Sequence, residues 1–339
     1  MPNTTLQKLS ARLHFWFINA RPSSLPQSMM TALTAAAVAA AQPGFSLLLA
    51  IIAVLGAALA HLSMNLFDDY FDYQKLQSTW REDLAASGQR ARTGKCPYLT
   101  SGAATSDELL LAACGFGAAA VLCGLPILLC RGWVIMWPVV LCAILGIFYS
   151  AEPLRLSYRG LGEAVIGVIF GPLLMAGVYM AACSSPITHI IVPAIALGLL
   201  VTNILYTHSV LDAKADSFAG KLTLAGLLQT PERMQQAAAF FCFAPFGLML
   251  LAVLSGLLTP WWLLTLLALP LAIALYRSVS LHIHQPHITP QRRLWYGPIA
   301  NWQRACRNGQ TWFVLRWYMA RNLTALFALL STIAALLCI

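Results

Sequence analysis

Charged side chains are scarce in this sequence. Only 10% of its 339 residues are Asp, Glu, Lys or Arg, whereas 59% are hydrophobic. Because a soluble domain carries about 25% charged residues, this composition excludes an ordinary soluble protein and predicts a membrane protein with several spans. The first 24 residues also lack the apolar core and small-residue cleavage site of a signal peptide, so we expect no cleaved leader.

Paired cysteine motifs are missing as well. The chain has nine cysteines but no C-x-x-C pair, and most of the nine lie inside apolar runs. Cysteine in such a run is a small packing residue. We therefore interpret the cysteines as packing groups and predict no metal or redox site from them.

Apolar runs suited to crossing a bilayer recur along the whole chain. The hydrocarbon core is ~30 Å thick, which takes about 20 residues of helix. Nine segments come near this length, and they predict an all-α, polytopic membrane protein that forms a single domain over residues 1–339. The nine predicted spans are residues 25–42, 45–66, 109–129, 133–150, 161–183, 189–211, 236–257, 260–281 and 318–338.

Basic residues are almost absent from one set of connecting loops. Four loops are very short, and of the 21 Lys and Arg residues only Arg131 falls in them. Lys and Arg mark cytoplasmic loops, so we expect the N-terminus inside and the C-terminus outside, in a membrane such as the bacterial inner membrane. This rule and contact with anionic lipid account for the net charge of +9, and no nucleic-acid partner is needed.

The sequence NLFDDYFDY, residues 65–73, ends the second predicted span with three carboxylates. At 100° per residue, its polar side chains share one face of a helix. These side chains are Asn65, Asp68, Asp69 and Asp72. Like charges at this spacing repel one another and destabilise a helix, so we expect a cation beside them.

A second group of carboxylates follows the sixth predicted span. Asp212 and Asp216 are four residues apart, and His208 lies one turn earlier on the same face. Two carboxylate groups at one membrane depth form a hard-oxygen site of the kind that suits Mg²⁺. The alternative is that both groups are helix ends solvated by headgroups, which fits less well with two such groups in a charge-poor chain.

Basic residues follow each carboxylate group. The loop after the second span contains Arg90, Arg92 and Lys95, and Lys221 comes soon after Asp216. Arg and Lys beside Mg²⁺-binding carboxylates make a site for a diphosphate. We therefore predict that these residues bind the phosphates of a ligand.

These motifs together resemble the UbiA superfamily of intramembrane prenyltransferases, and within it the 1,4-dihydroxy-2-naphthoate prenyltransferases of menaquinone synthesis. The resemblance rests on four blocks in the family's order and covers most of the chain. The blocks are ARPSSLP at 20–26, NL with DYFDY within 65–73, YRGLGE with FGP within 158–172, and DxxxD with GKLTL within 212–224.

The resemblance implies nine helices around a central cavity capped by cytoplasmic loops. It also implies Mg²⁺-dependent transfer of a prenyl group from an isoprenoid diphosphate to an aromatic acceptor such as a dihydroxynaphthoate. The implied metal ligands are Asp68, Asp69, Asp72, Asp212 and Asp216. The implied donor-binding residues are Asn65, Arg90, Arg92, Lys95 and Lys221.

Four further residues are catalytic candidates on the same resemblance. Tyr149, at the end of the fourth span, either stabilises an allylic cation or contacts phosphate, unless it is an interfacial belt tyrosine. Arg155 and Tyr158 are expected to line the acceptor pocket. His208 is expected to act as a base toward the acceptor hydroxyl or to support such a group.

The chain also departs from the naphthoate enzymes. They usually have asparagine where this chain has Asp68, and an Asn-Asn pair and an Arg where it has His208, Ser209 and Leu211. They also carry a further aspartate a few residues after the first motif, which this chain lacks. We therefore expect its metal ligation or its acceptor to differ from the typical member.

Two other functions stay open at this point. A UbiA-type terpene cyclase uses the same metal site without an acceptor. A non-enzymatic transporter or binder of a prenyl phosphate is the second alternative, although it would place ionisable residues near the bilayer midplane. Residues 283–317, rich in Trp, Arg and His, are interpreted as a cytoplasmic amphipathic segment rather than a histidine metal site.

Overall fold

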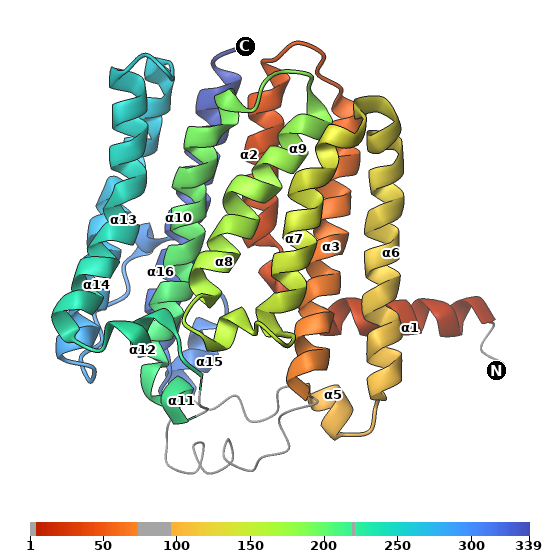
Figure 1. Cartoon of the computed structure of the whole chain (residues 1–339). Coiled ribbons are helices and arrows are strands. Elements are labelled where there is room, and N and C mark those ends of the chain that lie inside the picture. The colour runs from red at the N-terminus through yellow and green to blue at the C-terminus, as the bar shows by residue number, and fades with distance from the viewer. Residues whose placement is uncertain (1–4, 74–95, 219–220) are drawn as a thin grey trace.

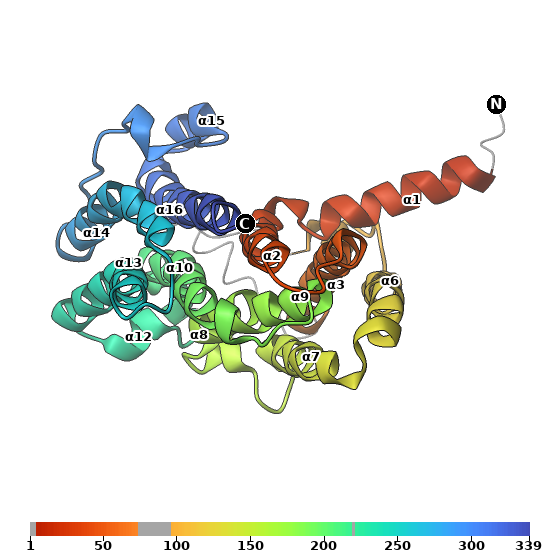
Figure 2. The same cartoon turned by 90° about the horizontal axis from the view of Figure 1, so that it is seen from above.

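The chain forms a bundle of long helices packed side by side (Figure 1). The computed structural model describes residues 5–73, 96–218 and 221–339, and these residues contain helices but no strand. Seen from above, the helices stand next to one another and α1 (Thr5–Asn19) extends away from them (Figure 2). The predicted all-α membrane fold is confirmed.

The long helices follow the predicted spans closely. They are α2 (Pro26–Ala40), α3 (Leu47–Tyr73), α6 (Ser106–Arg131), η2 with α7 (Trp133–Ile135, Met136–Ser150), α8 with η4 and α9 (Gly162–Val168, Ile169–Leu173, Leu174–Ala182), α10 (Thr188–Leu211), α13 (Pro231–Leu254), η5 with α14 (Pro260–Ala268, Leu269–His284) and α16 (Thr311–Leu336). The short elements are η1 (Pro22–Ser24), α5 (Pro97–Thr100), η3 (Leu156–Tyr158), α11 (Ala213–Phe218), α12 (Leu224–Leu228), η6 (Leu294–Tyr296) and α15 (Trp302–Arg307).

Eight helical segments of the described chain are long and apolar enough to cross a membrane. The remaining predicted span, residues 25–42, corresponds to α2. This helix has 15 residues and is therefore only ~22 Å long at 1.5 Å per residue. The count of nine thus stays a prediction. Helix α3 is longer than predicted and continues to Tyr73, so the first aspartate motif occupies its last turns.

The last span begins earlier than the sequence suggested. Arg316 lies inside α16 and is fully buried, although an arginine there was interpreted as part of the surface segment. Its guanidinium donates to the carbonyl oxygens of Ser278, Trp312 and Ile288 at 2.8–2.9 Å. Three backbone acceptors satisfy a charge that would otherwise be too costly to bury. The surface segment is consequently 285–310 rather than 283–317.

Small residues bring α8 and η4 close to α10. A Cβ atom on Gly171 would lie 2.4 Å from the Cα atom of Gly198, and one on Gly167 would lie 1.9 Å from Oγ1 of Thr202. Only glycine therefore permits this approach, as in other closely packed membrane helices. The contact holds α8 and η4, which follow the loop 151–161, against α10, which precedes the second aspartate motif.

Arg131, the one basic residue in the short loops, has a structural explanation. Its Nε donates to the carbonyl oxygen of Ala181 at 2.9 Å, and its terminal nitrogens donate to the carbonyl oxygens of Gly44 and Ala182 and to Oγ of Ser184 at 2.7–2.9 Å. The guanidinium thus satisfies the carbonyls at the end of α9, which have no partner within their own helix. It also ties three loops together at the end opposite the aspartates.

Candidate active site

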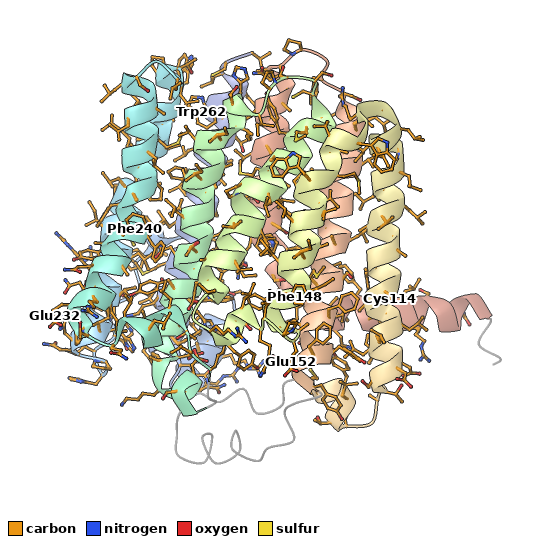
Figure 3. All side chains as sticks on the ribbon, in the orientation of Figure 1. Cys114, Phe148, Glu152, Glu232, Phe240 and Trp262 are labelled. Atoms are coloured by element: carbon orange, nitrogen blue, oxygen red, sulfur yellow. The ribbon has the colours of Figure 1, made fainter. Side chains whose placement is uncertain are left out.

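Both aspartate motifs lie at the same end of the bundle. The C-terminal end of α3, next to α5, and the short helix α11 both lie toward the bottom of the view in Figure 1. Figure 3 labels the acidic residues Glu152 and Glu232 toward this end and Trp262 near the other. The predicted concentration of acidic side chains at one end is therefore present among the described residues.

The cation expected beside the first motif is Arg21. One of its terminal nitrogens lies 3.2 Å from Oδ2 of Asp68 and 3.2 Å from Oδ1 of Asp69. Burial lowers the pKa of Arg21, but attraction to Asp68 and Asp69 outweighs burial and the net pKa is raised. Sequence reasoning did not place Arg21 in the site, although it belongs to the ARPSSLP block.

Each carboxylate of the first motif also accepts a hydrogen bond from a hydroxyl group. Ser150 Oγ donates to Asp68 at 2.6 Å. The Tyr98 hydroxyl donates to Asp69 at 3.1 Å. The Tyr158 hydroxyl donates to Asp72 at 3.1 Å. These bonds orient the carboxylates, and because a carboxylate has about four acceptor positions, a group oriented in this way can also coordinate a metal ion.

Two of these tyrosines have contacts that the sequence did not predict. The Tyr158 hydroxyl contacts Asp72 and its ring lies 4.0 Å beneath the guanidinium carbon of Arg155, and its place in the acceptor pocket stays a prediction. Tyr98 was not predicted at all, because it comes from α5, far along the chain from α3. Burial and the Asp69 carboxylate raise the pKa of Tyr98, so its hydroxyl stays protonated as a donor.

Asn65 holds the turn that carries Arg21. Its side-chain nitrogen donates to the carbonyl oxygen of Ala20 and to Oγ of Ser24, both at 2.9 Å, and Arg21 donates to its backbone carbonyl at 2.8 Å. Arg21 has a φ of 59°, in the left-handed region that non-glycine residues rarely adopt. The amide of Asn65 thus stabilises a backbone conformation that directs Arg21 toward the aspartates.

The polar contacts continue deeper into the bundle through His61. Its Nε2 lies 3.2 Å from Oγ of Ser24 and its Nδ1 lies 2.7 Å from Oγ of Ser28. The ring also packs on Phe170 of η4, with centroids 4.6 Å apart. Sequence reasoning missed His61 because a single histidine in an apolar run carries no motif signal.

The second motif is divided between two helices. Asp212 caps the C-terminal end of α10, which ends at Leu211, and Asp216 belongs to α11. The hydrogen bond from the Asp216 nitrogen to the Asp212 carbonyl, 2.9 Å, nevertheless preserves the helical spacing. His208 Nδ1 lies 3.6 Å from Oδ2 of Asp212, which agrees with the predicted shared face.

Lys221 connects the two motifs. Burial lowers its pKa, but attraction to the Tyr149 hydroxyl and to the carboxylates of Asp216 and Asp68 outweighs burial, so the net pKa is raised. The Lys221 ammonium therefore lies within the electrostatic influence of an aspartate of each motif. Its backbone nitrogen also donates to the carbonyl oxygen of Asp216 at 2.9 Å, which ties Lys221 to the second motif.

A pocket beside Lys221 gathers several predicted residues. Its cavity has a volume of about 40 Å³, which is space for a few water molecules. Its lining includes Tyr149, His208, Asp216, Lys221 and Glu163. Of these, only Glu163 was not predicted as a site residue.

Glu163 holds the segment that carries Lys221. Its Oε1 accepts a hydrogen bond from the backbone nitrogen of Leu224 at 3.0 Å. The backbone nitrogen of Gly160 donates to the carbonyl oxygen of Leu222 at 2.7 Å on the same segment. Two loops far apart in sequence are thereby paired beside the pocket.

The donor set at this end suits Mg²⁺ and a phosphate ligand. In the described part of the chain, no three His, Cys, Asp or Glu side chains converge as a preformed metal cluster. Hard carboxylate oxygens from both sides match Mg²⁺. Arg21 Nε is buried without an acceptor among the described residues, which leaves a donor for an anion. Arg90, Arg92 and Lys95 lie outside the described residues.

Comparison with known sequences identifies a single family. The sequence model of the UbiA prenyltransferase family matches residues 28–296. A 1,4-dihydroxy-2-naphthoate octaprenyltransferase from Escherichia coli is 29% identical over 286 residues, covering 81% of this chain and 87% of the relative. The enzyme of the same name from Haemophilus influenzae is 29% identical over 225 residues, covering 64% of this chain and 70% of the relative.

Solved structures support the fold. A UbiA homologue from Archaeoglobus fulgidus bound to GPP and Mg²⁺ has a TM-score of 0.58 at 16% identity and covers 95% of this chain and 99% of its own. A structure described as digeranylgeranylglyceryl phosphate synthase has a TM-score of 0.63 at 13% identity and covers 96% and 99%. At these identities the likeness concerns the fold.

Proposed function

This chain belongs to the UbiA prenyltransferase family, and we propose that it transfers a prenyl group from an isoprenoid diphosphate to a dihydroxynaphthoate-type aromatic acceptor with the help of Mg²⁺. That it is a prenyltransferase follows from its family and its curated relatives. The donor, the acceptor and the metal are our proposal for this chain. The pocket that brings Tyr149, His208, Asp216 and Lys221 together is the observation that supports it most directly.

The carboxylates of both motifs would hold the metal. Bound Mg²⁺ supplies Lewis-acid activation of the diphosphate as a leaving group. The proposed ligands are Asp68, Asp69 and Asp72 from α3, with Asp212 and Asp216 from the second motif. The hydroxyl donors on the first three keep their oxygens oriented, so that ligand binding requires little rearrangement of this side of the site.

Arg21 and Lys221 would bind the diphosphate. Both are half-buried cations close to the aspartate motifs, and charge-assisted hydrogen bonds to phosphate are about twice as strong as neutral ones. Negative charge on the leaving group grows as the carbon–oxygen bond breaks, so both cations stabilise the transition state more than the bound donor. Their contribution is therefore expected in the turnover rate as well as in donor affinity.

The acceptor would enter next to the same pocket. The departing diphosphate leaves an allylic carbocation, which the electron-rich ring of the acceptor attacks. Tyr149 presents an aromatic ring at this pocket, where it stabilises the cation by a cation–π contact. His208, paired with Asp212 at 3.6 Å, accepts the acceptor's hydroxyl proton. The ring becomes aromatic again when the alkylated carbon loses its original substituent, as a proton or as carbon dioxide, and the hydroxyl is reprotonated.

The direct test is a product assay. Purified protein with Mg²⁺ is incubated with prenyl diphosphates of several lengths, with and without 1,4-dihydroxy-2-naphthoate, and products are identified by mass spectrometry. We expect a prenylated product only when the acceptor is present. A cyclic hydrocarbon formed without acceptor would instead indicate a terpene cyclase, and donor binding without turnover would indicate a transporter or binder.

We also propose that the site faces the cytoplasm. The proposal rests on the distribution of Lys and Arg between the two sets of loops. A C-terminal reporter that is active only outside the cytoplasm should be active when fused after Ile339. Activity of a reporter that works only in the cytoplasm would reverse the orientation.

A further inference from the structure

The C-terminal third of the chain contains no acidic residue. The last carboxylate side chain is Glu232, and residues 233–339 contain eight arginines without a single Asp or Glu. The preference for positive charge in cytoplasmic loops concerns Lys and Arg and places little restriction on acids. Topology alone therefore does not explain a cationic region of this length.

Half of these arginines gather on the segment between α14 and α16. Arg292, Arg293, Arg304 and Arg307 are all exposed. Between them, Leu294 is 92% exposed and Trp295 is 50% exposed, although neither belongs to a membrane span. We call this surface the basic ledge, and it consists of Arg292, Arg293, Leu294, Trp295, Arg304 and Arg307.

The basic ledge is built on a fixed support. Tyr296 and Ile299 are buried against the core of the bundle. Asn322 of α16 donates to the carbonyl oxygens of Tyr296 and Pro298 at 2.8 and 3.0 Å. The guanidinium of Arg292 lies 5.2 Å from the ring of Trp302 at the start of α15, which joins the two pairs of arginines. The exposed leucine and tryptophan are therefore held outward by buried neighbours.

The position of the basic ledge points to lipid. Figure 1 shows α15 toward the same end of the bundle as α11 and α12, and Figure 2 shows it on the outer side, beside α14 and α16. Helix α1 lies across the bundle direction toward this end, with Leu13 and Ile18 exposed, as expected for a helix in the membrane interface. The basic ledge thus faces the surroundings of the bundle rather than the aspartates.

We propose that the basic ledge binds the headgroups of acidic phospholipids in the adjoining leaflet, with Leu294 and Trp295 inserted among the upper acyl chains. Arginine binds phosphate in a planar, bidentate manner, and tryptophan favours the headgroup level. The absence of carboxylates over this whole region removes the groups that would repel such lipids. The inference is independent of the reaction that the aspartate site performs.

Exposed cysteines allow a site-specific test. Cys306 lies on α15 between Arg304 and Arg307, and Cys338 is exposed at the other end of the bundle. Two forms of the full chain are prepared, each keeping one of these cysteines while the other exposed cysteines are replaced by serine. Each is labelled with a fluorescent maleimide and placed in phosphatidylcholine nanodiscs that contain either brominated phosphatidylglycerol or brominated phosphatidylcholine at equal mole fraction.

We expect brominated phosphatidylglycerol to quench the label at Cys306 more than brominated phosphatidylcholine does, and to show no such preference at Cys338. The excess quenching by brominated phosphatidylglycerol at Cys306 should fall about fivefold for each arginine replaced in Arg304→Gln and Arg307→Gln. It should also fall at high salt. It should remain in Arg233→Gln, which removes an exposed arginine elsewhere. Equal quenching by both lipids at Cys306 would overturn the proposal and leave these arginines to topology or to an acidic protein. A preference unchanged in the double variant would overturn it too.

Discussion

The guanidinium of Arg21 lies 3.2 Å from a carboxylate oxygen of Asp68, and the two residues are 47 positions apart in sequence. The same guanidinium reaches Asp69. A cation from the turn before α2 therefore offsets part of the negative charge of the carboxylates that are proposed to bind metal. This arrangement stabilises the end of α3 and also competes with the metal.

Replacing Arg21 should consequently move two properties in opposite directions. In Arg21→Gln, we expect Mg²⁺ alone to bind about fivefold more tightly, since a neighbouring charge at this distance is worth ~1 kcal/mol even in water. Turnover should fall, because the diphosphate loses a cation. Titration calorimetry with Mg²⁺ and steady-state kinetics measure the two effects. Arg12→Gln, which removes a surface partner of Glu108, is the matched control, and weaker Mg²⁺ binding in Arg21→Gln would contradict the competition.

Lys221 and Lys214 offer a matched pair of substitutions. Lys221 interacts with Asp216 and Asp68, whereas Lys214 is exposed on α11. We expect Lys221→Ala to lower the turnover rate about 100-fold, as loss of a transition-state donor does, and to raise the Michaelis constant for the donor more than for the acceptor. Lys214→Ala should leave both unchanged. Normal donor kinetics in Lys221→Ala would remove this residue from the site.

Metal dependence should follow the two motifs. Asp69→Asn and Asp216→Asn should each abolish turnover, and EDTA should do the same to the unmodified protein until Mg²⁺ is returned. The thermal midpoint of Asp69→Asn should not fall by much, since the amide oxygen can still accept from Tyr98 and one like charge on α3 is removed. Asp107→Asn, at the exposed start of α6, serves as the control. Turnover that survives either substitution or EDTA would exclude the assigned ligands.

His61 should act by positioning the Arg21 turn. Ser24 Oγ accepts from Asn65 and donates its only hydrogen to the carbonyl oxygen of Arg21 at 2.8 Å. It can therefore only accept from His61, which places the imidazole proton of His61 on Nε2. Nδ1 then accepts from Ser28. His61 thus serves as one donor and one acceptor at once.

Two substitutions separate this role from simple filling of space. His61→Phe keeps a ring against Phe170 but removes one hydrogen-bond partner from each serine, so it should cost about 1–3 kcal/mol of unfolding free energy and raise the Michaelis constant for the donor. His61→Gln offers a donor and an acceptor and should restore the donor constant. Chemical denaturation and donor titrations provide the readouts. Equal donor constants for the two variants would show that His61 only fills space.

Arg131 should matter for stability and not for topology or catalysis. Arg131→Leu removes four hydrogen bonds from a charged group and leaves carbonyl oxygens of Ala181, Ala182 and Gly44 without this donor. We expect a loss of about 2–4 kcal/mol, with unchanged Michaelis constants. Arg131→Lys should recover only part of the loss, because a single ammonium cannot reach all four acceptors. A thermal midpoint equal to that of the parent would show that the loops hold without this residue.

The sequence alone determined the features that depend on local order. Apolar runs, the spacing of the aspartates and the asymmetric distribution of Lys and Arg predicted the helical spans, two carboxylate groups at one end and the family to which the chain belongs. These properties follow from helix geometry and from transfer of side chains into a bilayer, and both depend on neighbours within a few residues.

Only the tertiary structure decided which groups meet across the helices. It placed Arg21 on Asp68 and Asp69, Tyr98 on Asp69 and the Tyr158 hydroxyl on Asp72. It also buried Arg316 within the last span. The physical reason is that a charged or hydroxyl side chain is stabilised by whichever donor or acceptor the packed helices bring within ~3 Å. That partner comes from a distant part of the chain, and the local sequence pattern does not indicate which distant residues become neighbours in space.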